Sequence, residues 1–340
     1  QKKAGLNSGY ADEEYQHCGA LVLATAEDLY AAAQLIVKVK QPLAQDLAYL
    51  REHHILFSYL HLAADPELVE SLCGSGLTAI PFESIVDADG HLPLLAPMSQ
   101  VAGHIATIRG ASLLFRNRGG RGVLLGGIEG AEAGRVVVLG AGVAGSHAVA
   151  VAAALGARVD VLDLNEDKLA ALKTRYPSII THLSTAQTIE TLCVQADLVV
   201  GAVLLAGRRA PVVLQQSVVK KMPEGSVIID IAIDQGGCVE NIRVTSSEEL
   251  CYVEHGVIHS AVPNMPAAVA RTSSQSLSSA VLPYVQVLAS LDINTLVMTA
   301  LDQITTDNIK IQAEQALGRA IAIHRERIVD PVLQREMVSV

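Results

Sequence analysis

The run Val138–Ser146, VLGAGVAGS, contains the spacing Gly-x-Gly-x-x-Gly directly after an apolar stretch. The stretch before it predicts a buried strand, and the Ala-rich stretch after it predicts a helix. In such a strand–turn–helix unit, Gly140 permits the tight turn, Gly142 lets a pyrophosphate approach the backbone, and Gly145 lets the helix pack close to the strand. The N-terminus of the helix would present free N–H groups to the phosphates. The run therefore predicts a dinucleotide-binding turn.

The next apolar run, RVDVLD at 158–163, ends at Asp163, 18 residues after Gly145. An acid at this distance can bind a ribose 2′-hydroxyl and would repel a 2′-phosphate, which favours NAD over NADP. Lys168 is the nearest cation downstream and leaves NADP open as the alternative. The turn residues Val143 and Ala144 are expected to contact the cofactor as well. A glycine-rich turn in an ordinary β-α-β unit is the other interpretation that these residues allow.

Composition excludes several classes of function. The chain has 340 residues, is 50% hydrophobic and carries a formal net charge of -10, so nucleic acid and anionic membrane surfaces are not expected partners. It has neither an apolar leader at its start nor a long uninterrupted apolar stretch. The five cysteines are scattered without a Cys-x-x-Cys pair, which predicts no zinc or other metal site, no disulfide framework and a cytoplasmic location.

Short apolar runs alternate with helical stretches, as in an α/β protein with parallel sheets. The expected strands include 35–40, 55–60, 135–140, 158–163, 197–203 and 226–232. After about Pro263 the pattern becomes helical and remains so, with breaks near 291–294. We expect two Rossmann-like domains with a cleft between them. The nucleotide domain covers 95–272, and the discontinuous substrate domain combines 1–94 with the C-terminal helices of 273–340.

Polar residues follow three of these strands, where α/β proteins bind their ligands. Lys40 ends the first strand, His61 follows the second, and Asp230 and Asp234 follow another. A lysine, a histidine and an aspartate beside a nicotinamide could bind a carbonyl, shuttle a proton and activate water. Each has a structural alternative: a solvated strand end for Lys40, a core position for His61, and a turn-forming side chain for Asp234. Four other histidines are expected to be structural: His53, His54, His104 and His259.

Eight phrases in order from residue 9 to about 285 resemble the alanine dehydrogenase family. They are KVKQPL, ILFSYLHLAADPEL, LPLLAPMSQVAG, GGRGVLLGG, VVVLGAGVAG, DLVVGAVLLAGRRAP, IIDIAIDQGGCVE and NMPAAVARTSSQSL. A more distant similarity is to the NAD-binding subunit of proton-translocating transhydrogenase. The resemblance implies a cytoplasmic homo-hexamer that interconverts L-alanine and NAD with pyruvate, ammonium and NADH.

The resemblance also implies roles for individual residues. Lys40 would bind the substrate and polarise its carbonyl, His61 would hydrogen-bond the same oxygen and transfer a proton, and Asp234 would act on water or ammonia. The remaining implied contacts lie near the substrate or along the nucleotide: Met98, Ser99, Ser184, Val203, Leu204, Asn264 and Met265.

The sequence departs from the family pattern in several places. The chain begins after a family segment of a strand, a helix and a second strand that carries a carboxylate-binding arginine, so we expect that arginine and those first strands to have no counterpart here. Gln41, His104 and Pro263 also differ from the usual residues. These departures leave two alternatives to an active alanine dehydrogenase, a degenerate NAD-binding relative and a transhydrogenase-like subunit.

Overall fold

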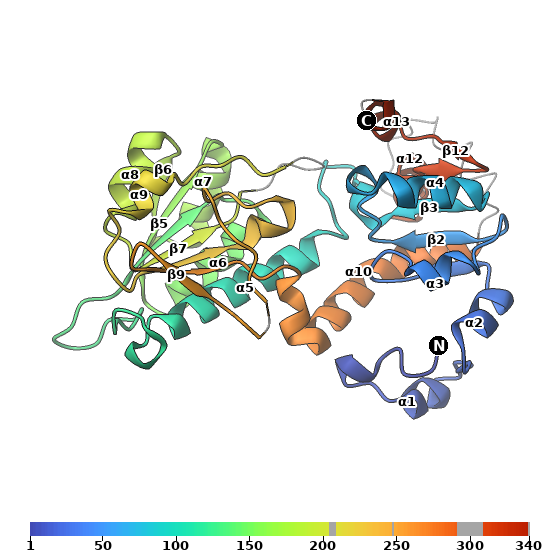
Figure 1. The fold of residues 1–340 in the computed structure, drawn as a ribbon, viewed down its shortest axis with the longest axis horizontal. Helices are drawn as coiled ribbons and strands as arrows, with labels where there is room; N and C mark the ends of the chain where they lie inside the picture. Colours follow the sequence, from blue (N-terminus) through green and yellow to red (C-terminus); the bar gives the residue numbers. More distant parts are fainter. Residues whose placement is uncertain (204–208, 247, 291–308, 339–340) are drawn as a thin grey trace. The chain divides into compact units, whose positions relative to one another are not determined.

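The computed structural model describes residues 1–203, 209–246, 248–290 and 309–338, and it divides the chain into two units (Figure 1). The first unit combines Gln1–Pro97 with Val269–Val340, and the second is Met98–Ala268. The sequence places domain boundaries after residues 94 and 272, and these two units change after residues 97 and 268.

The second unit is built on a seven-stranded sheet with the strand order β6-β5-β4-β7-β8-β10-β9. All neighbouring strands pair in parallel except β9, which is antiparallel to β10. The predicted strand 158–163 has the predicted bounds, and the other three predicted strands of this unit are shorter by one to three residues. The strands are β4 (Arg135–Leu139), β5 (Arg158–Asp163), β6 (Ile180–Leu183), β7 (Leu198–Gly201), β8 (Val227–Asp230), β9 (Tyr252–Glu254) and β10 (Val257–Ser260).

Helices cover this sheet on both faces. Along β4, Val136 and Val138 belong to one buried cluster, and Val137 and Leu139 belong to another. The first cluster includes residues of α5 (Ala96–Leu113), α6 (Val143–Ala154) and α7 (Glu166–Arg175), and the second includes residues of α8 (Ala186–Cys193) and α9 (Gln216–Val219). Because successive side chains of a strand point to opposite faces, this alternation buries both faces, as the near-continuous apolar strands predict.

The first unit contains a five-stranded sheet with the order β1-β2-β3-β11-β12. Strands β1 to β3 are parallel, β11 pairs antiparallel with β3, and β12 pairs antiparallel with β11. Its strands are β1 (Leu35–Val37), β2 (Ile55–Ser58), β3 (Thr78–Pro81), β11 (Ile323–His324) and β12 (Arg327–Ile328). Its helices are α1 (Asp12–His17), α2 (Ala26–Ala32), α3 (Ala44–Leu47), α4 (Pro66–Gly74), α10 (Ala270–Ser290), α12 (Ile309–Arg319) and α13 (Pro331–Val338).

The expectation of an all-helical end after Pro263 is wrong, because β11 and β12 form a hairpin that extends the sheet. Ile323 pairs with Ala79 of β3 and with Ile328 of β12. The turn residues Arg325 and Glu326 both have positive φ, 47° and 67°. Such turns are normally signalled by Asn or Gly. The local sequence therefore does not predict this hairpin, and the pairing of β11 with β3 stabilises it. The expected breaks near 291–294 lie outside the described residues.

The predicted strand 35–40 is too long, since β1 ends at Val37. The N–H of Lys38 still donates to the Phe57 carbonyl over 3.1 Å, and the chain then leaves the sheet. The lysines at 38 and 40 therefore belong to the loop after the strand.

The helices of the described residues include none that is long and apolar enough to cross a bilayer. All five cysteines carry free thiols, and two of them, Cys193 and Cys238, are buried.

Helix α5 crosses α6 at very short range at Gly103. A Cβ on this residue would lie 2.2 Å from the carbonyl oxygen of Ala144 and 3.0 Å from the nitrogen of Ala148, both backbone atoms. Thr107, one turn later, donates its hydroxyl to the Ala148 carbonyl over 3.0 Å. Only a residue without a side chain allows this approach.

We therefore expect Gly103→Ala to lower the free energy of unfolding by about 1–3 kcal/mol, because an overpacked contact must push two helix backbones apart. The matched control is Gly74→Ala in α4, where an added Cβ meets nothing within 4 Å. That substitution should be neutral or stabilising by up to about 1 kcal/mol. Calorimetric unfolding of the two variants measures the difference, and equal stabilities would contradict the packing argument.

Candidate functional site

The glycine turn after β4 has the conformation that the sequence predicts. Gly140 has a φ of 106°, and a Cβ there would lie 2.6 Å from the carbonyl oxygen of Ala202. A Cβ on Gly145 would lie only 1.8 Å from the Gly140 oxygen, whereas one on Gly142 would meet nothing within 4 Å. The first and third glycines are thus required by contacts inside the protein, and the second faces open space at the start of α6, where a phosphate could approach the backbone.

The Asp163 carboxylate reaches back to this turn. Its Oδ2 accepts the N–H of Ala141 over 2.6 Å, and its Oδ1 accepts the N–H of Asn165 over 2.9 Å. Each carboxylate oxygen has two acceptor sites, so both remain able to accept a hydroxyl group. The half-buried acid therefore stabilises the turn as well as standing where a ribose is expected.

Other predicted nucleotide contacts lie along the same edge of the sheet. The N–H of Ser184 donates to the carbonyl of Asp163 over 2.9 Å. The nitrogen of Val203 would lie 3.2 Å from a Cβ on Gly140. Leu204 lies outside the described residues. Met98 and Ser99 lie in the first turn of α5, both half-buried, and their roles stay predictions.

The two acids after β8 have different surroundings. Asp230 is fully buried, and its side chain accepts the N–H of Ala232 over 2.9 Å. The sequence offered a turn-forming side chain as the alternative for Asp234, and in the structure Asp230 makes this turn. Burial raises the pKa of Asp230, and the N–H groups that bind its carboxylate oppose this rise. Asp234 lies exposed in the short 3-10 helix Ile231–Gln235.

The carboxylate of Asp234 contacts the segment that precedes α10. It accepts the N–H of Asn264, with distances of 3.1 Å to Oδ1 and 3.3 Å to Oδ2. Asn264 is exposed and has a φ of 49°, in the left-handed region that non-glycine residues rarely adopt. Two predicted site residues, distant in sequence, are thus brought together. Met265 is 3% exposed and packs in the hydrophobic core, so only its backbone is available to a ligand.

In the first unit, the loop that carries Lys40 is held by a buried acid. Asp46 is 4% exposed, and its Oδ2 lies 2.7 Å from the Lys38 ammonium and 3.0 Å from the N–H of Leu43. The Ser58 hydroxyl, at the end of β2, donates to the Lys40 carbonyl over 2.8 Å. The backbone of Lys40 is therefore fixed beside β2, while its side chain is exposed.

His61 follows the same strand β2, and a second acid holds its backbone. Its φ of 49° is left-handed, a conformation that costs a non-glycine residue about 1–2 kcal/mol. Glu83 Oε1 accepts the His61 N–H over 2.5 Å and the Leu60 N–H over 3.1 Å. The same oxygen lies 4.0 Å from His61 Nδ1, and the ring stacks on Tyr59 with 6.2 Å between centroids. With its side chain 45% exposed, His61 is not a core residue.

The sequence prediction missed Glu83. It lies in the 3-10 helix Phe82–Ser84 directly after β3, so its position at a strand end is the signal that could have found it. Strands β1, β2 and β3 are parallel neighbours, and their carboxyl ends lead to Lys40, His61 and Glu83 in turn.

Two of the histidines expected to be structural are buried and bonded. His54 accepts the Arg51 N–H at Nδ1 and pairs with the Tyr30 carbonyl at Nε2, each over 2.9 Å. His259 Nδ1 pairs with the Val257 carbonyl over 3.0 Å. Burial lowers the pKa of both rings, which favours their neutral forms.

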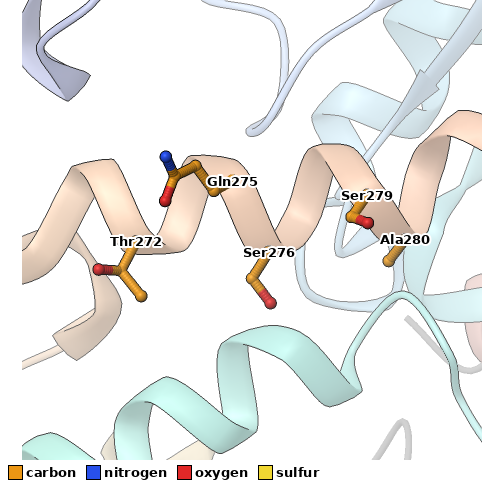
Figure 2. A pocket seen from close by; sticks show the side chains of 5 residues that line it. All are labelled: Thr272, Gln275, Ser276, Ser279 and Ala280. Carbon is orange, nitrogen blue, oxygen red and sulfur yellow. The ribbon is translucent and has the colours of Figure 1, made fainter.

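A shallow hollow lies along α10, and Figure 2 shows that its lining comes from one face of this helix. The lining carries hydroxyl, amide and methyl groups and no acid or base: Thr272, Gln275, Ser276, Ser279 and Ala280. It supplies none of the predicted catalytic groups.

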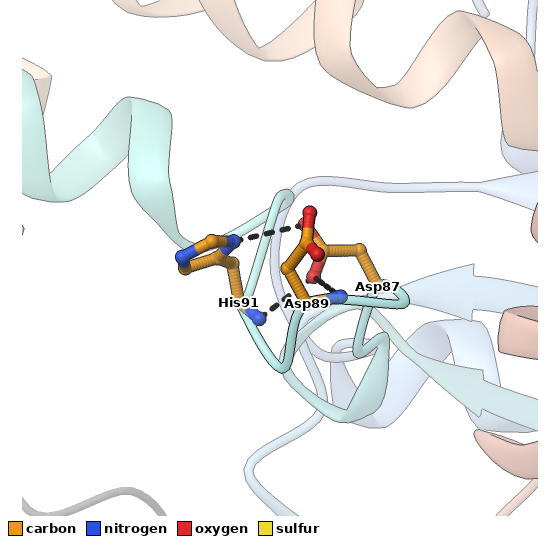
Figure 3. Close-up of side chains that lie close together, drawn as sticks. All are labelled: Asp87, Asp89 and His91. Atoms are coloured by element: carbon orange, nitrogen blue, oxygen red, sulfur yellow. Dashed lines mark hydrogen bonds and ion pairs between the residues drawn. The ribbon is translucent and has the colours of Figure 1, made fainter.

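Asp87, Asp89 and His91 lie close together on one loop (Figure 3). Asp87 Oδ1 accepts the N–H of Asp89 over 3.0 Å and that of His91 over 2.8 Å, and its Oδ2 lies 3.4 Å from His91 Nδ1. These contacts are those of a turn stabilised by its own side chains, and they account for the cluster without an ion.

The turn after β4 and the acid after β5 are typical of the α/β proteins that bind a dinucleotide, a class that includes the nicotinamide-dependent oxidoreductases. Comparison with known proteins identifies the family. The model of the "Alanine dehydrogenase/PNT, N-terminal domain" matches residues 1–102, and that of the C-terminal domain matches 106–316. The chain belongs to the alanine dehydrogenase family.

Individual relatives agree with this assignment. The chain is 44% identical over 292 residues to the alanine dehydrogenase of Methanococcus maripaludis, covering 85% of this chain and 78% of that one. It is 46% identical over 290 residues to that of Mycobacterium tuberculosis H37Rv, with the same coverage. It is 43% identical over 289 residues to that of Bacillus subtilis, covering 84% of this chain and 76% of the relative.

Solved structures extend the comparison. An L-alanine dehydrogenase structure matches 99% of this chain and 90% of its own with a TM-score of 0.91 and 41% identity. A transhydrogenase from Sinorhizobium meliloti matches 97% of this chain and 89% of its own with a TM-score of 0.78 and 23% identity, which shows a shared fold.

We expect Glu83→Gln to loosen the turn at His61, because Oε2 also lies 3.3 Å from the Leu60 nitrogen, and an amide with its oxygen at the Oε1 position would direct its NH₂ toward that N–H group. The free energy of unfolding should fall by about 1–3 kcal/mol, and exchange of the Leu60 and His61 amide hydrogens should accelerate by about tenfold or more. The control Glu67→Gln, an exposed acid in the first turn of α4, should change stability by less than about 0.5 kcal/mol. Unchanged amide exchange in Glu83→Gln would show that the turn holds without this carboxylate.

Proposed function

We propose that this chain is an NAD-dependent alanine dehydrogenase that reversibly converts L-alanine, water and NAD to pyruvate, ammonium and NADH. Identity of 43–46% to alanine dehydrogenases over most of the chain supports the reaction class. The observation that carries the proposal is the turn at His61, where a left-handed backbone held by Glu83 keeps an exposed imidazole at a strand end beside the Lys40 loop. Strain of this kind is typical of functional positions.

The residues at the glycine turn fit NAD. Gly142 leaves open space at the N-terminus of α6, a 12-residue helix whose first N–H groups suit a pyrophosphate. The Asp163 carboxylate suits an unphosphorylated ribose. A bound NAD would supply the hydride acceptor for deamination, and NADH the hydride donor for the reverse reaction. The residues proposed to hold it are Ser99, Gly140, Gly142, Val143, Ala144, Gly145, Asp163, Ser184, Val203, Leu204, Asp234, Asn264 and Met265.

The first unit supplies the groups for the substrate carbonyl. Lys40 is a cation on a fixed backbone, and it binds the substrate oxygen and polarises the carbonyl bond. His61 directs Nδ1 toward Glu83, 4.0 Å away, so Nε2 is the nitrogen that exchanges a proton with that oxygen. Met98 and Asn264 complete the proposed substrate contacts.

The second unit supplies Asp234. Its exposed carboxylate takes a proton from the water that attacks the imine, and in the reverse direction it returns this proton to the hydroxyl group that leaves as water when the imine forms. The Asn264 N–H donates to this carboxylate and so holds it in place.

The remaining proposals rest on the resemblance to the family and on composition. We propose a cytoplasmic location and a homo-hexameric assembly with small-molecule substrates. With a net charge of -10, it is not expected to bind nucleic acid or membrane.

Asp163→Ala should narrow the preference for NADH over NADPH by at least about tenfold, equivalent to about 1.4 kcal/mol, because the repulsion of a 2′-phosphate is lost. Fluorescence titration gives both dissociation constants. The matched control is Asp160→Ala on the same strand, whose carboxylate pairs with His182 over 2.6 Å. It should leave the preference unchanged, and equal affinity of the unaltered chain for the two cofactors would contradict the assignment of Asp163.

The reaction itself is tested by steady-state kinetics. The chain should oxidise NADH when pyruvate and ammonium are both present, and His61→Ala should lower kcat by about 10² to 10⁴ while NADH still binds. His53→Ala, which removes an exposed histidine of the same unit, is the control and should keep normal turnover. NADH oxidation by pyruvate without ammonium would indicate a 2-hydroxy-acid dehydrogenase instead, and normal turnover of His61→Ala would make His61 a structural residue.

A further inference from the structure

The carboxylate of Asp230 is fully buried at the end of β8, and hydrogen bonds surround it. Oδ1 accepts the Ala232 N–H over 2.9 Å and lies 3.5 Å from the Cys238 thiol. Oδ2 accepts the N–H of Cys238 over 2.8 Å and that of Val239 over 3.2 Å. The group has no exposed surface, so it cannot itself touch a substrate.

Two glycines make room for this carboxylate. A Cβ on Gly201, at the end of β7, would lie 3.3 Å from Asp230 Oδ1 and 2.5 Å from the Cys238 sulfur. A Cβ on Gly237 would lie 3.0 Å from Oδ2, and Gly237 also has a φ of 80°. The second glycine of the Gln-Gly-Gly run is therefore required both by its backbone conformation and by its contact with the carboxylate.

The hydrogen bonds to Asp230 enclose the segment that carries Asp234. Ala232 lies two residues before Asp234, and Cys238 lies four residues after it, so both sides of the segment are tied to one carboxylate on β8. Between these ties Asp234 is exposed and binds the N–H of Asn264. The position of Asp234 relative to the sheet thus depends on a group that it does not touch.

A carboxylate is the side chain suited to this position. It offers acceptors only, whereas the amide of asparagine would direct an NH₂ at N–H donors, and serine has one oxygen where two are used. Three backbone N–H groups and the Cys238 thiol contact this carboxylate and offset the cost of burying it. We propose that Asp230 is a positioning residue for the reaction, setting the place of the Asp234 carboxylate beside Asn264. This inference rests on the function proposed above for Asp234.

The test compares Asp230→Asn with Asp197→Asn in the full chain. Asp197 is an acid of the same unit, 8% exposed, that accepts the Arg135 N–H over 2.8 Å at the opposite, amino edge of the sheet. We expect Asp230→Asn to lower kcat for reductive amination of pyruvate by about 10- to 100-fold, the effect of a displaced catalytic group. The KM for pyruvate and the NADH dissociation constant should change by less than about threefold, and Asp197→Asn should lose stability but keep kcat within about twofold.

A double-mutant cycle with Asp234→Asn tests the positioning role of Asp230 separately from the catalytic role of Asp234. If Asp230 acts through Asp234, Asp230→Asn should lower kcat no further once Asp234 has been replaced. If the two substitutions lower kcat additively, Asp230 does not act through Asp234. If folded Asp230→Asn keeps the wild-type kcat while Asp234→Asn is impaired, Asp230 has no positioning role. Either result would overturn the role of Asp230 and leave the proposed role of Asp234 in place. Wild-type kcat in Asp234→Asn would remove the role of Asp234 and this inference with it.

If Asp230→Asn does not fold, Gly201→Ala perturbs the same cluster and keeps the carboxylate, because the new Cβ would lie 2.5 Å from the Cys238 sulfur and 3.3 Å from Asp230 Oδ1. The proposal then predicts a similar loss of kcat with NADH binding retained, and an unchanged kcat in this variant would overturn it.

Discussion

The interaction on which both units depend is a side-chain carboxylate that accepts backbone N–H groups where the chain leaves a parallel sheet. The sheet ladder ends there, and the amide groups of the following loop need other partners, because an unpaired buried N–H is costly. Asp46, Glu83, Asp163 and Asp230 each accept one or more such groups. Each fixes a loop that carries a residue expected to act on substrate or cofactor.

This arrangement separates two tasks that one side chain could not perform well. A catalytic group must be accessible and free to change its protonation state, whereas a structural acceptor must be enclosed and fully bonded. The acids that hold the loops are buried or half-buried, and Lys40, His61 and Asp234 are exposed. The left-handed backbones of His61 and Asn264 fit the same division, since a strained conformation persists only where neighbouring contacts determine it.

Membership in the alanine dehydrogenase family agrees with what the residues indicate about chemistry. Three features could be predicted from the sequence because each depends on a local pattern with a known physical reason: the glycine turn, the acid after β5 and the polar strand ends. The role of Glu83 could not be predicted in this way, because an acid two residues past a strand is common. Its hydrogen bonds to Leu60 and His61 join parts of the chain that are distant in sequence. The same holds for the contact of Asp234 with Asn264, 30 residues apart.

The sequence by itself determined the α/β class, the approximate places of the expected strands and the glycine turn, because apolar periodicity and glycine spacing act over a few residues. It misplaced the end of β1 and missed the hairpin of β11 and β12, whose turn has two non-glycine residues with positive φ. Only the tertiary structure decided which acid makes the turn after β8, with Asp230 enclosed and Asp234 exposed. The reason is physical: the room beside Asp230 is made by Gly201 on a neighbouring strand, and no local pattern carries that information.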